Sequence, residues 1–430
     1  MRHRNMPARM RKQTGAVSLN MLVLFGTVFV GLMGFAVDLG RLYLSRGELR
    51  TAAESMALSA AGRLIGTEAS TTDASAAARR QVETGTGFGN RYEYGAIPIG
   101  ESTGFLNSEI HDPTYWATAS ESTGEGDETT AGSGEVAGSV ARHVRIELTG
   151  EAPLVFWRFL SLAQEGKVAI RVRASAGVSA PLCTACGIDP IAIAPIDPSD
   201  TVNFGFVTNT RYTFGYTCAG PPPPQPLAGT TQRLPYVILN RLNEEAELFT
   251  EDSQQLFRTG AVGLLPSTTE ARSCITINAE ETIWATASQL PCNSNTVQTA
   301  VRAYLCGLAT RMDISLVQGC NTIAEVDTLN ELFQPDTDLT DLEDYTGYIG
   351  NTRRVITVVI VEALNPAGTM VVLGFRQFLL QPVPNNSGIA PSDANGRIAV
   401  TYIGNVVPLK QGRFGGCQVS SGPGKVVLHR

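Results

Sequence analysis

The sequence is poor in the residues from which most active sites are built. Its 430 residues include only four histidines, and no His-Glu-x-x-His, Gly-x-Ser-x-Gly or P-loop pattern occurs. Such patterns supply the zinc ligands, the nucleophile or the phosphate-binding loop of common enzyme classes. Their absence argues against a metalloenzyme, a serine hydrolase or a P-loop NTPase. We expect no catalytic residue, no cofactor and no small-molecule substrate.

Charge is also scarce. Charged residues make up 17% of the chain, and the formal net charge is -7. Because there is no basic excess to neutralise a phosphate backbone, we expect no nucleic-acid partner. With 43% hydrophobic residues, the composition is that of a folded globular protein.

One long stretch, residues 16–37, carries no charge at all. At about 1.5 Å of rise per residue, a helix of this length spans the ~30 Å hydrocarbon core of a bilayer. The stretch therefore predicts a transmembrane helix in contact with the lipid bilayer. A cleaved signal peptide is the alternative, but its apolar core normally has only about 7–15 residues. We expect a retained anchor.

Basic residues precede this helix, namely Arg2, Arg4, Arg9, Arg11 and Lys12. By the positive-inside rule, such a cluster stays in the cytoplasm, so the residues after the helix are expected on the other side of the membrane.

Cysteine does not occur before residue 183, so every cysteine falls in the part expected to be exported. The eight are Cys183, Cys186, Cys218, Cys274, Cys292, Cys306, Cys320 and Cys417. In an oxidising compartment they predict up to four disulfides, whose pairing the sequence leaves open. Cys183 and Cys186 have thioredoxin-motif spacing, but no strand-to-helix context surrounds them, so we interpret them as structural. No paired histidine or second Cys-x-x-Cys completes a zinc set.

The first helix is expected to continue beyond the bilayer, because residues 38–64 contain no proline and are rich in helix-forming residues. Gly66 offers an end to it. At about 100° per residue, one face of the span is small or polar, comprising Asn20, Thr27, Gly31, Gly34 and Asp38. Farther along, the same face becomes apolar and comprises Leu42, Leu49, Met56 and Ala60.

This change along one face has a physical reason. In lipid, helices associate through small residues and side-chain hydrogen bonds, whereas in water they associate by burying apolar area. We therefore predict a membrane-helix interface followed by a periplasmic helix interface. The alternative is a lone anchor whose outer turns pack on its own domain.

Residues 15–20 read Gly-Ala-Val-Ser-Leu-Asn, residues 34–43 read Gly-Phe-Ala-Val-Asp-Leu-Gly-Arg-Leu-Tyr, and residues 49–61 are rich in alanine. These stretches resemble the N-terminal segment of TadG-like (TadE/TadG-type) Flp pilus assembly proteins. The resemblance implies a bacterial inner-membrane protein with one transmembrane helix, a cytoplasmic N-terminus and a periplasmic C-terminal domain. It also implies contacts with other components of the pilus or of a related secretion system.

The sequence departs from related families at two points. Pilins usually carry Glu five residues after the glycine at which prepilin peptidase cleaves. In this sequence the residue five positions after Gly15 is Asn20, so cleavage at Gly15 stays open. Longer family members carry an Asp-x-Ser-x-Ser metal loop, and residues 313–317 lack its last serine. We predict no such metal site. The acidic cluster at residues 336–344 is interpreted as a solvated face, with calcium binding as the alternative.

Alternating apolar and charged residues at 144–148 and 168–174 predict two half-buried strands joined by an aromatic connector, residues 153–160. Amphipathic helices are predicted at residues 236–258 and 296–312, the second with Asn295 as a cap. Residues dense in Val, Ile and Phe predict further strands in the same antiparallel sheet, at 354–362, 369–380, 397–403 and 425–429.

The predicted fold class is α+β, with a long N-terminal transmembrane helix, a β-rich periplasmic domain with an antiparallel sheet, and a disulfide-braced helical part. The expected segments are a basic cytoplasmic segment 1–15, the transmembrane helix 16–37, its periplasmic extension 38–66, a β-rich region 67–180 with a mobile acidic loop 120–139, a Pro-rich connector 181–233, a helical cysteine-containing region 234–350, and C-terminal strands 351–430 that join the sheet.

The predicted function is a non-enzymatic role in assembling or anchoring a Flp-type pilus or a related secretion apparatus. A membrane-tethered periplasmic enzyme or ligand-binding domain that shares only the anchor type is the alternative.

Overall fold

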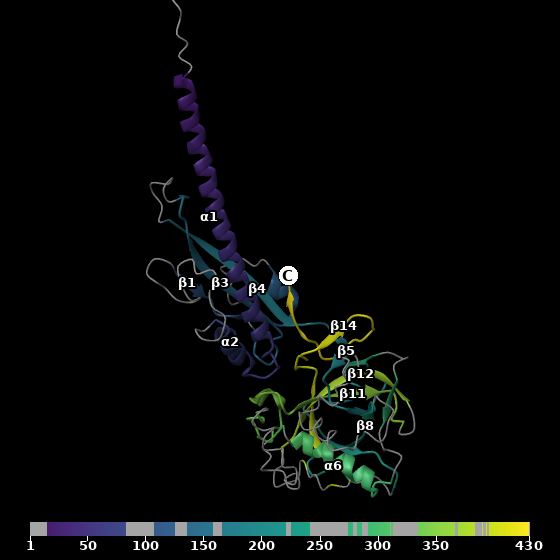
Figure 1. Ribbon diagram of the computed structural model, residues 1–430. Coiled ribbons are helices and arrows are strands. Elements are labelled where there is room, and N and C mark those ends of the chain that lie inside the picture. Colours follow the sequence, from purple (N-terminus) through teal and green to yellow (C-terminus); the bar gives the residue numbers. More distant parts are fainter. Residues whose placement is uncertain are drawn as a thin grey trace, which may run out of the picture. The chain divides into compact units, whose positions relative to one another are not determined.

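Figure 1 shows the computed structural model of the chain. The residues that it describes are 15–82, 107–124, 136–157, 166–220, 225–240, 274–277, 282–285, 291–309, 311–312, 334–365, 369–382, 389, 393 and 395–429. The chain divides into two compact units. Unit 1 comprises Met1–Met56, Arg79–Asp112 and Ile146–Ala174, and unit 2 comprises Ala57–Ala78, Pro113–Arg145 and Ser175–Arg430.

Helix α1, Gly15–Ala61, belongs to unit 1 as far as Met56. No proline interrupts its 47 residues, and the predicted continuation of the first helix beyond residue 38 is confirmed. Its stretch Asn20–Ala61 is long and apolar enough to cross a membrane. Large apolar side chains between Met21 and Val37 are exposed, as expected of a surface that lipid rather than protein would cover.

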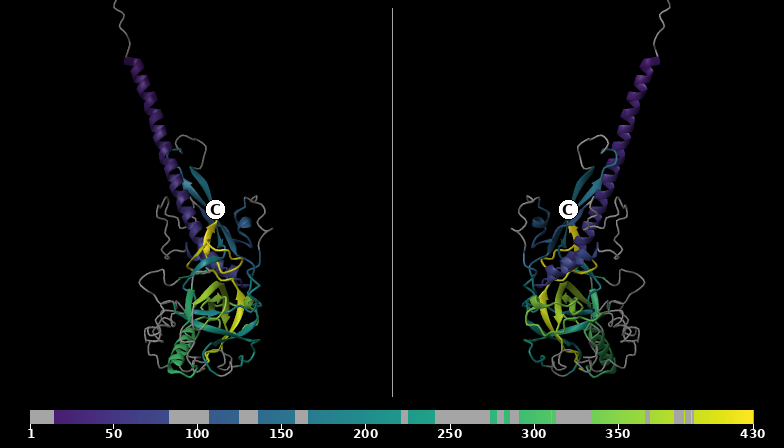
Figure 2. Two further views of the ribbon diagram at one scale, coloured as in Figure 1. Left: turned by 90° about the vertical axis from the view of Figure 1, so that its right-hand side faces the viewer. Right: turned by 90° about the vertical axis from the view of Figure 1, so that its left-hand side faces the viewer.

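The strands of unit 1 come from β1, Ser108–Ile110, β3, His143–Pro153, and β4, Lys167–Val178. Strand β3 lies between β1 and β4 in the sheet, and β1 pairs with it antiparallel. The two strands that the alternating pattern predicted are therefore confirmed as sheet neighbours. Figures 1 and 2 show β3 and β4 beside α1.

Three short elements contribute to unit 2 before its main sheet, namely α2, Ser70–Arg80, β2, Thr114–Trp116, and α3, Ala119–Thr123. Tyr115 of β2 is buried, and its hydroxyl donates to the carbonyl of Thr71 over 2.8 Å. Most of the acidic loop predicted at 120–139 lies outside the described residues.

Six strands of unit 2 pair into a closed ring in the order β12, β11, β6, β8, β7, β13 and back to β12. Their bounds are β6 Ile191–Ile193, β7 Arg211–Tyr216, β8 Arg233–Asn240, β11 Val355–Val361, β12 Thr369–Leu380 and β13 Ile398–Gly404. Strand β10, Thr282–Ala285, pairs with both β8 and β12. Two pairs, β6 with β11 and β7 with β8, are parallel, so this sheet is mixed rather than purely antiparallel.

Aromatic side chains dominate the largest core cluster of unit 2. The ring of Phe378 lies 5.0 Å from that of Phe214, 5.5 Å from Phe206 and 5.2 Å from Tyr402. Helix α6, Asn295–Ala309, adds Tyr304 and several aliphatic side chains to the same cluster. Aromatic pairs at these distances bury large areas and favour tilted or edge-on packing.

A small sheet of β14, Gly412–Phe414, β5, Leu182–Cys186, and β9, Cys274–Thr276, carries two disulfides. They are Cys183–Cys417 and Cys186–Cys274. Because the two cysteines of the thioredoxin-like spacing bond to different partners, their interpretation as structural residues is confirmed.

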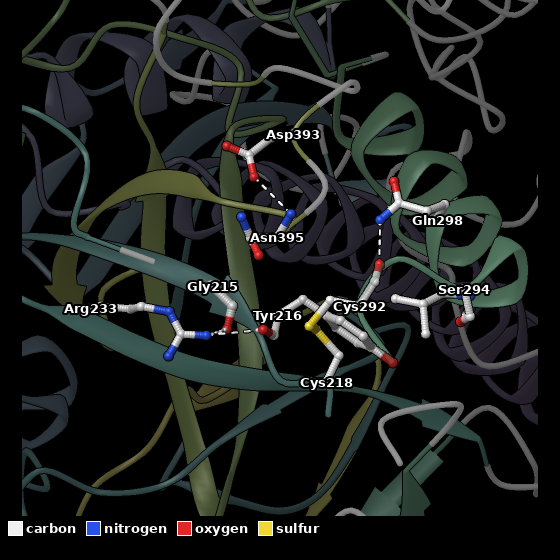
Figure 3. The surroundings of a disulfide bond; sticks show 10 residues. Gly215, Tyr216, Cys218, Arg233, Cys292, Ser294, Gln298, Asp393 and Asn395 are labelled. Carbon is white, nitrogen blue, oxygen red and sulfur yellow. Dashed lines mark hydrogen bonds between the residues drawn. A yellow bond between two sulfur atoms is a disulfide. The ribbon is translucent and has the colours of Figure 1, made fainter. Parts of the chain in front are cut away.

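The third disulfide, Cys218–Cys292, lies just before α6 (Figure 3). There the side chain of Gln298 donates to the carbonyl of Cys292, which fastens the first turns of the helix to the bonded cysteine. The expectation that disulfides brace the helical part therefore agrees with this bond. Cys306 is also disulfide-bonded, and Cys320 lies outside the described residues.

The helix predicted at 236–258 is wrong where the structure describes it, because residues up to Asn240 belong to strand β8. Leu234, Tyr236, Val237, Ile238 and Leu239 are all buried, so the strand is covered on both faces. A continuous apolar run of this kind has no alternation that would distinguish it from a buried helix. Residues 241–258 lie outside the described part of the chain.

The second predicted helix is confirmed as α6, but its cap differs. The hydroxyl of Ser294, rather than the side chain of Asn295, accepts the backbone N–H of Val297 over 3.3 Å. Ser at this position satisfies one of the free N–H groups at the start of a helix.

The expectation of one sheet shared by all the C-terminal strands is also corrected. Strands β11, β12 and β13 belong to the closed ring, and only β15, Val426–His429, pairs with β4. Sequence alternation identifies strands but not their partners, since pairing is decided by long-range contacts.

Replacing Cys218 and Cys292 by alanine should lower the free energy of unfolding by roughly 2–4 kcal/mol, since this bond closes a separation of 74 residues. Urea unfolding of the full chain in detergent would measure the loss. Val207→Ala, at an exposed apolar side chain, serves as the control. Equal midpoints for the disulfide variant and the control would contradict this expectation.

His143 packs against His429, with ring centroids 4.9 Å apart. Burial, followed by the charges of His429 and Arg142, lowers the pKa of His143 to about 4. The unfolded chain, with a histidine pKa of about 6.5, binds this proton more readily, so stability falls as the pH drops from about 6.5 toward 4. Between pH 7 and 4.5 the wild type should lose on the order of 2–3 kcal/mol more than His143→Gln in urea unfolding. Parallel losses would refute the assignment.

Candidate functional site

The five residues of the predicted membrane-helix interface are not equivalent in the structure. Asp38 and Gly34 are buried, Gly31 is half-buried, and Asn20 and Thr27 are exposed. The rest of the chain therefore covers this face at Gly34 and Asp38 and leaves it open at Asn20 and Thr27.

Asp38 binds the connector that follows β3. Its Oδ1 accepts the backbone N–H of Val155 over 2.9 Å, and its Oδ2 accepts those of Phe156 and Trp157 over 3.0 and 2.8 Å. These three N–H groups are consecutive along the chain, so one carboxylate can reach all of them. A carboxylate satisfies several such donors at once and forms stronger, charge-assisted hydrogen bonds.

Gly34 lies one helical turn before Asp38 and contacts the same connector. A methyl group at Gly34 would lie 2.7 Å from the ring of Phe156, closer than carbon atoms approach, so glycine is required here for the ring to pack on the helix. Beside it, the rings of Phe35 and Trp157 have centroids 6.1 Å apart. The helix and the connector therefore share an aromatic contact next to the Asp38 hydrogen bonds.

A second close approach to α1 involves strand β3, which precedes the connector. A methyl group at Gly150 of β3 would lie 2.9 Å from the side chain of Leu49. From Leu49 to Asp38 the helix advances about 16 Å at 1.5 Å per residue. From Gly150 to Val155 the strand also advances about 16 Å at 3.3 Å per residue. The two contacts are thus separated by about the same length on the helix and on the chain beside it.

The predicted periplasmic helix interface is largely covered by the chain. Leu49, Met56 and Ala60 are buried, and Leu42 is half-buried. The apolar area of Leu49, Met56 and Ala60 therefore already packs within the protein.

A groove of about 520 Å³ follows the open part of the membrane-helix face. Its lining comprises Leu22, Val23, Gly26, Thr27, Val30, Gly31, Gly34 and Phe156. The hydroxyl of Thr27 donates to the carbonyl of Val23 over 2.8 Å, so the polar group is satisfied within the helix. The groove therefore exposes mostly apolar side chains and three glycines, which is typical of a surface on which helices pack in lipid.

Sequence reasoning missed the part that Phe156 and its neighbours play. The aromatic connector was visible as a run of apolar residues, but Asp38 and Val155 are 117 positions apart, and no local pattern links them. The sequence analysis also missed Gly26 and Val30, which line the groove but lie to one side of the predicted helix face. A search centred on the glycines of the span, rather than on Asn20, would have included both.

The acidic cluster at 336–344 is solvated only in part, because Asp341, Glu343 and Asp344 are exposed. Asp336 and Asp338 are buried, and Asp336 accepts hydrogen bonds from the Tyr348 hydroxyl and the Arg354 amide. Asp341 forms an ion pair of 2.8 Å with Arg211. Among the described residues no group of three or more His, Cys, Asp and Glu is placed to hold a metal ion.

Asp38→Ala should release the connector, since three N–H groups would lose their acceptor. We expect hydrogen exchange of the amides of Val155, Phe156 and Trp157 to accelerate by about 10- to 100-fold, as expected for the loss of a hydrogen bond to a charged group. Mass-spectrometric exchange on the full chain in detergent would measure it. Asp112→Ala, which removes an exposed carboxylate paired with Arg79, is the matched control. Equal exchange in the two variants would exclude this role for Asp38.

A family model described as Tad, putative Flp pilus-assembly TadE/G-like, matches residues 15–63. The match begins at the start of α1, ends two residues after it, and includes both Gly34 and Asp38. No curated protein and no solved structure matches the chain. The resemblance read from the sequence is confirmed: residues 15–63 of this chain form a TadE/G-like segment of the kind found in Flp pilus assembly proteins.

Proposed function

We propose that this chain is a single-pass inner-membrane protein with a periplasmic C-terminal domain, and that it helps to assemble or anchor a Flp-type pilus or a related secretion apparatus without catalysing a reaction. The observation that carries the proposal is that the segment matching the pilus-assembly family is also the helix with the exposed apolar span.

The disulfides support the export of unit 2. Three bonds join residues far apart in the sequence, at separations of 234, 88 and 74. Such bonds persist in the periplasm and are rare in the cytoplasm. Together with the basic residues before α1, they favour a cytoplasmic N-terminus.

Buried charges support a structural rather than a catalytic role. Asp189 and Arg311 form a buried ion pair of 2.7 Å, and Asp189 also accepts the N–H of Thr357 over 2.9 Å. The guanidinium of Arg354 donates to the carbonyls of Leu380 and Asp338. Groups engaged in this way hold loops to strands. Nothing in the described residues favours the alternative of a tethered enzyme.

The open groove on α1 is the surface that we assign to a partner helix in the membrane. Thr27 and Gly31 lie within it and allow a second helix to approach closely. The opposite face carries Phe25 and Phe29, which are 66% and 65% exposed and suit contact with lipid.

Thr27→Leu combined with Gly31→Leu should fill the groove. We expect the affinity for pilus components that co-purify from membranes to fall by about 5- to 30-fold, corresponding to the roughly 1–2 kcal/mol of a helix–helix contact in lipid. Surface fibres should decrease with it, as counted by electron microscopy. The matched control is Phe25→Leu combined with Phe29→Leu on the opposite face. The groove assignment fails if both double variants retain their partners and fibres equally.

A further inference from the structure

Three consecutive apolar side chains of the connector are exposed. Val155 and Phe156 are each 38% exposed and Trp157 is 43% exposed, beside Phe35 of α1 at 46%. A patch of this kind on a part of the protein surrounded by water would cost free energy, and clustered exposed apolar residues usually mark a surface that something covers.

The Asp38 hydrogen bonds determine where this patch lies along α1. They hold the amides of residues 155–157 at the point where the uncharged run 16–37 ends. Phe156 then packs on Gly34, about 6 Å farther into the run at 1.5 Å per residue. The patch is therefore level with the last turn of the transmembrane span, not beyond it.

Polarity along the hairpin changes in the matching direction. The first charged pair behind the patch is Glu151 with Lys167, whose atoms are 3.0 Å apart. Glu151 is four residues before Val155, or about 13 Å along the strand. Residues 152–157 are thus an uncharged run between Glu151 and Arg158, and along β3 the charges begin where water would be expected.

We propose that Val155, Phe156 and Trp157 insert into the outer interface of the bilayer beside α1, so that the hairpin formed by β3 and β4 is a second membrane contact of unit 1. This inference rests on the membrane anchoring proposed above. The occupant is lipid because the patch continues the exposed apolar surface of the span without a break, and tryptophan is enriched at that depth of a membrane.

A second contact would give the anchor a defined rotation. A lone helix turns freely about its axis in a bilayer, whereas a helix held to an inserted hairpin presents one face consistently. The groove beside Thr27 and Gly31 would then keep one orientation relative to the bilayer surface in every copy.

The experiment places a photo-reactive phenylalanine analogue, p-benzoylphenylalanine, at one position at a time in the full chain in phospholipid nanodiscs. The positions are Trp157 in the patch, Phe25 in the middle of the span, and Tyr43, which is 80% exposed and about 7 Å beyond Asp38 along the helix. Illumination is followed by mass spectrometry for phospholipid adducts. Val155 is a second position in the patch in case the change at Trp157 alters the unfolding midpoint.

We expect phospholipid adducts at both Phe25 and Trp157, each several-fold more abundant than at Tyr43. Adducts at Phe25 with none above the Tyr43 level at Trp157 or Val155 would overturn this inference and leave the anchor standing. Failure at Phe25 as well would overturn the anchor and the inference together. In membranes from the source cells, protein adducts in place of lipid adducts at Trp157 would show a protein-binding patch and also overturn it.

Discussion

In unit 1, the carboxylate of Asp38 accepts hydrogen bonds from three consecutive backbone amides of the connector, and the arrangement of the hairpin along α1 depends on them. An amide side chain in its place would offer only one acceptor oxygen. A negative charge at the end of the uncharged run 16–37 would ordinarily require water, and here peptide N–H groups satisfy it. Gly34 and Gly150 complete the arrangement by allowing Phe156 and Leu49 to pack closely.

Unit 2 is stabilised by different means. Its closed ring of six strands leaves no free edge between them, and its core is rich in aromatic side chains. The disulfides lie outside the long strands of this ring, where they join β5 to β9 and the region of β14, and hold the start of α6. Such bonds stabilise segments whose own hydrogen bonding is short, by restricting the unfolded chain.

The two parts suggest a division of labour within the proposed function. The TadE/G-like segment carries the groove and the hairpin contact, both of which we assign to the membrane and to partner helices there. Unit 2 has the character of a braced body in which buried ion pairs such as Asp189–Arg311 hold loops to strands.

The sequence by itself determined the apolar span, the continuous first helix, the family resemblance of residues 15–63 and the positions of strands β3, β4, β11, β12, β13 and β15. Each of these is written in local composition or in the spacing of neighbouring residues. Only the tertiary structure decided that Asp38 and Gly34 bind residues 155–157, that residues 233–240 form a strand, and which cysteines are bonded. Each of these joins residues far apart in the chain or concerns a buried run without periodicity. Contacts of that kind depend on which surfaces meet after folding, and local patterns carry no information about them.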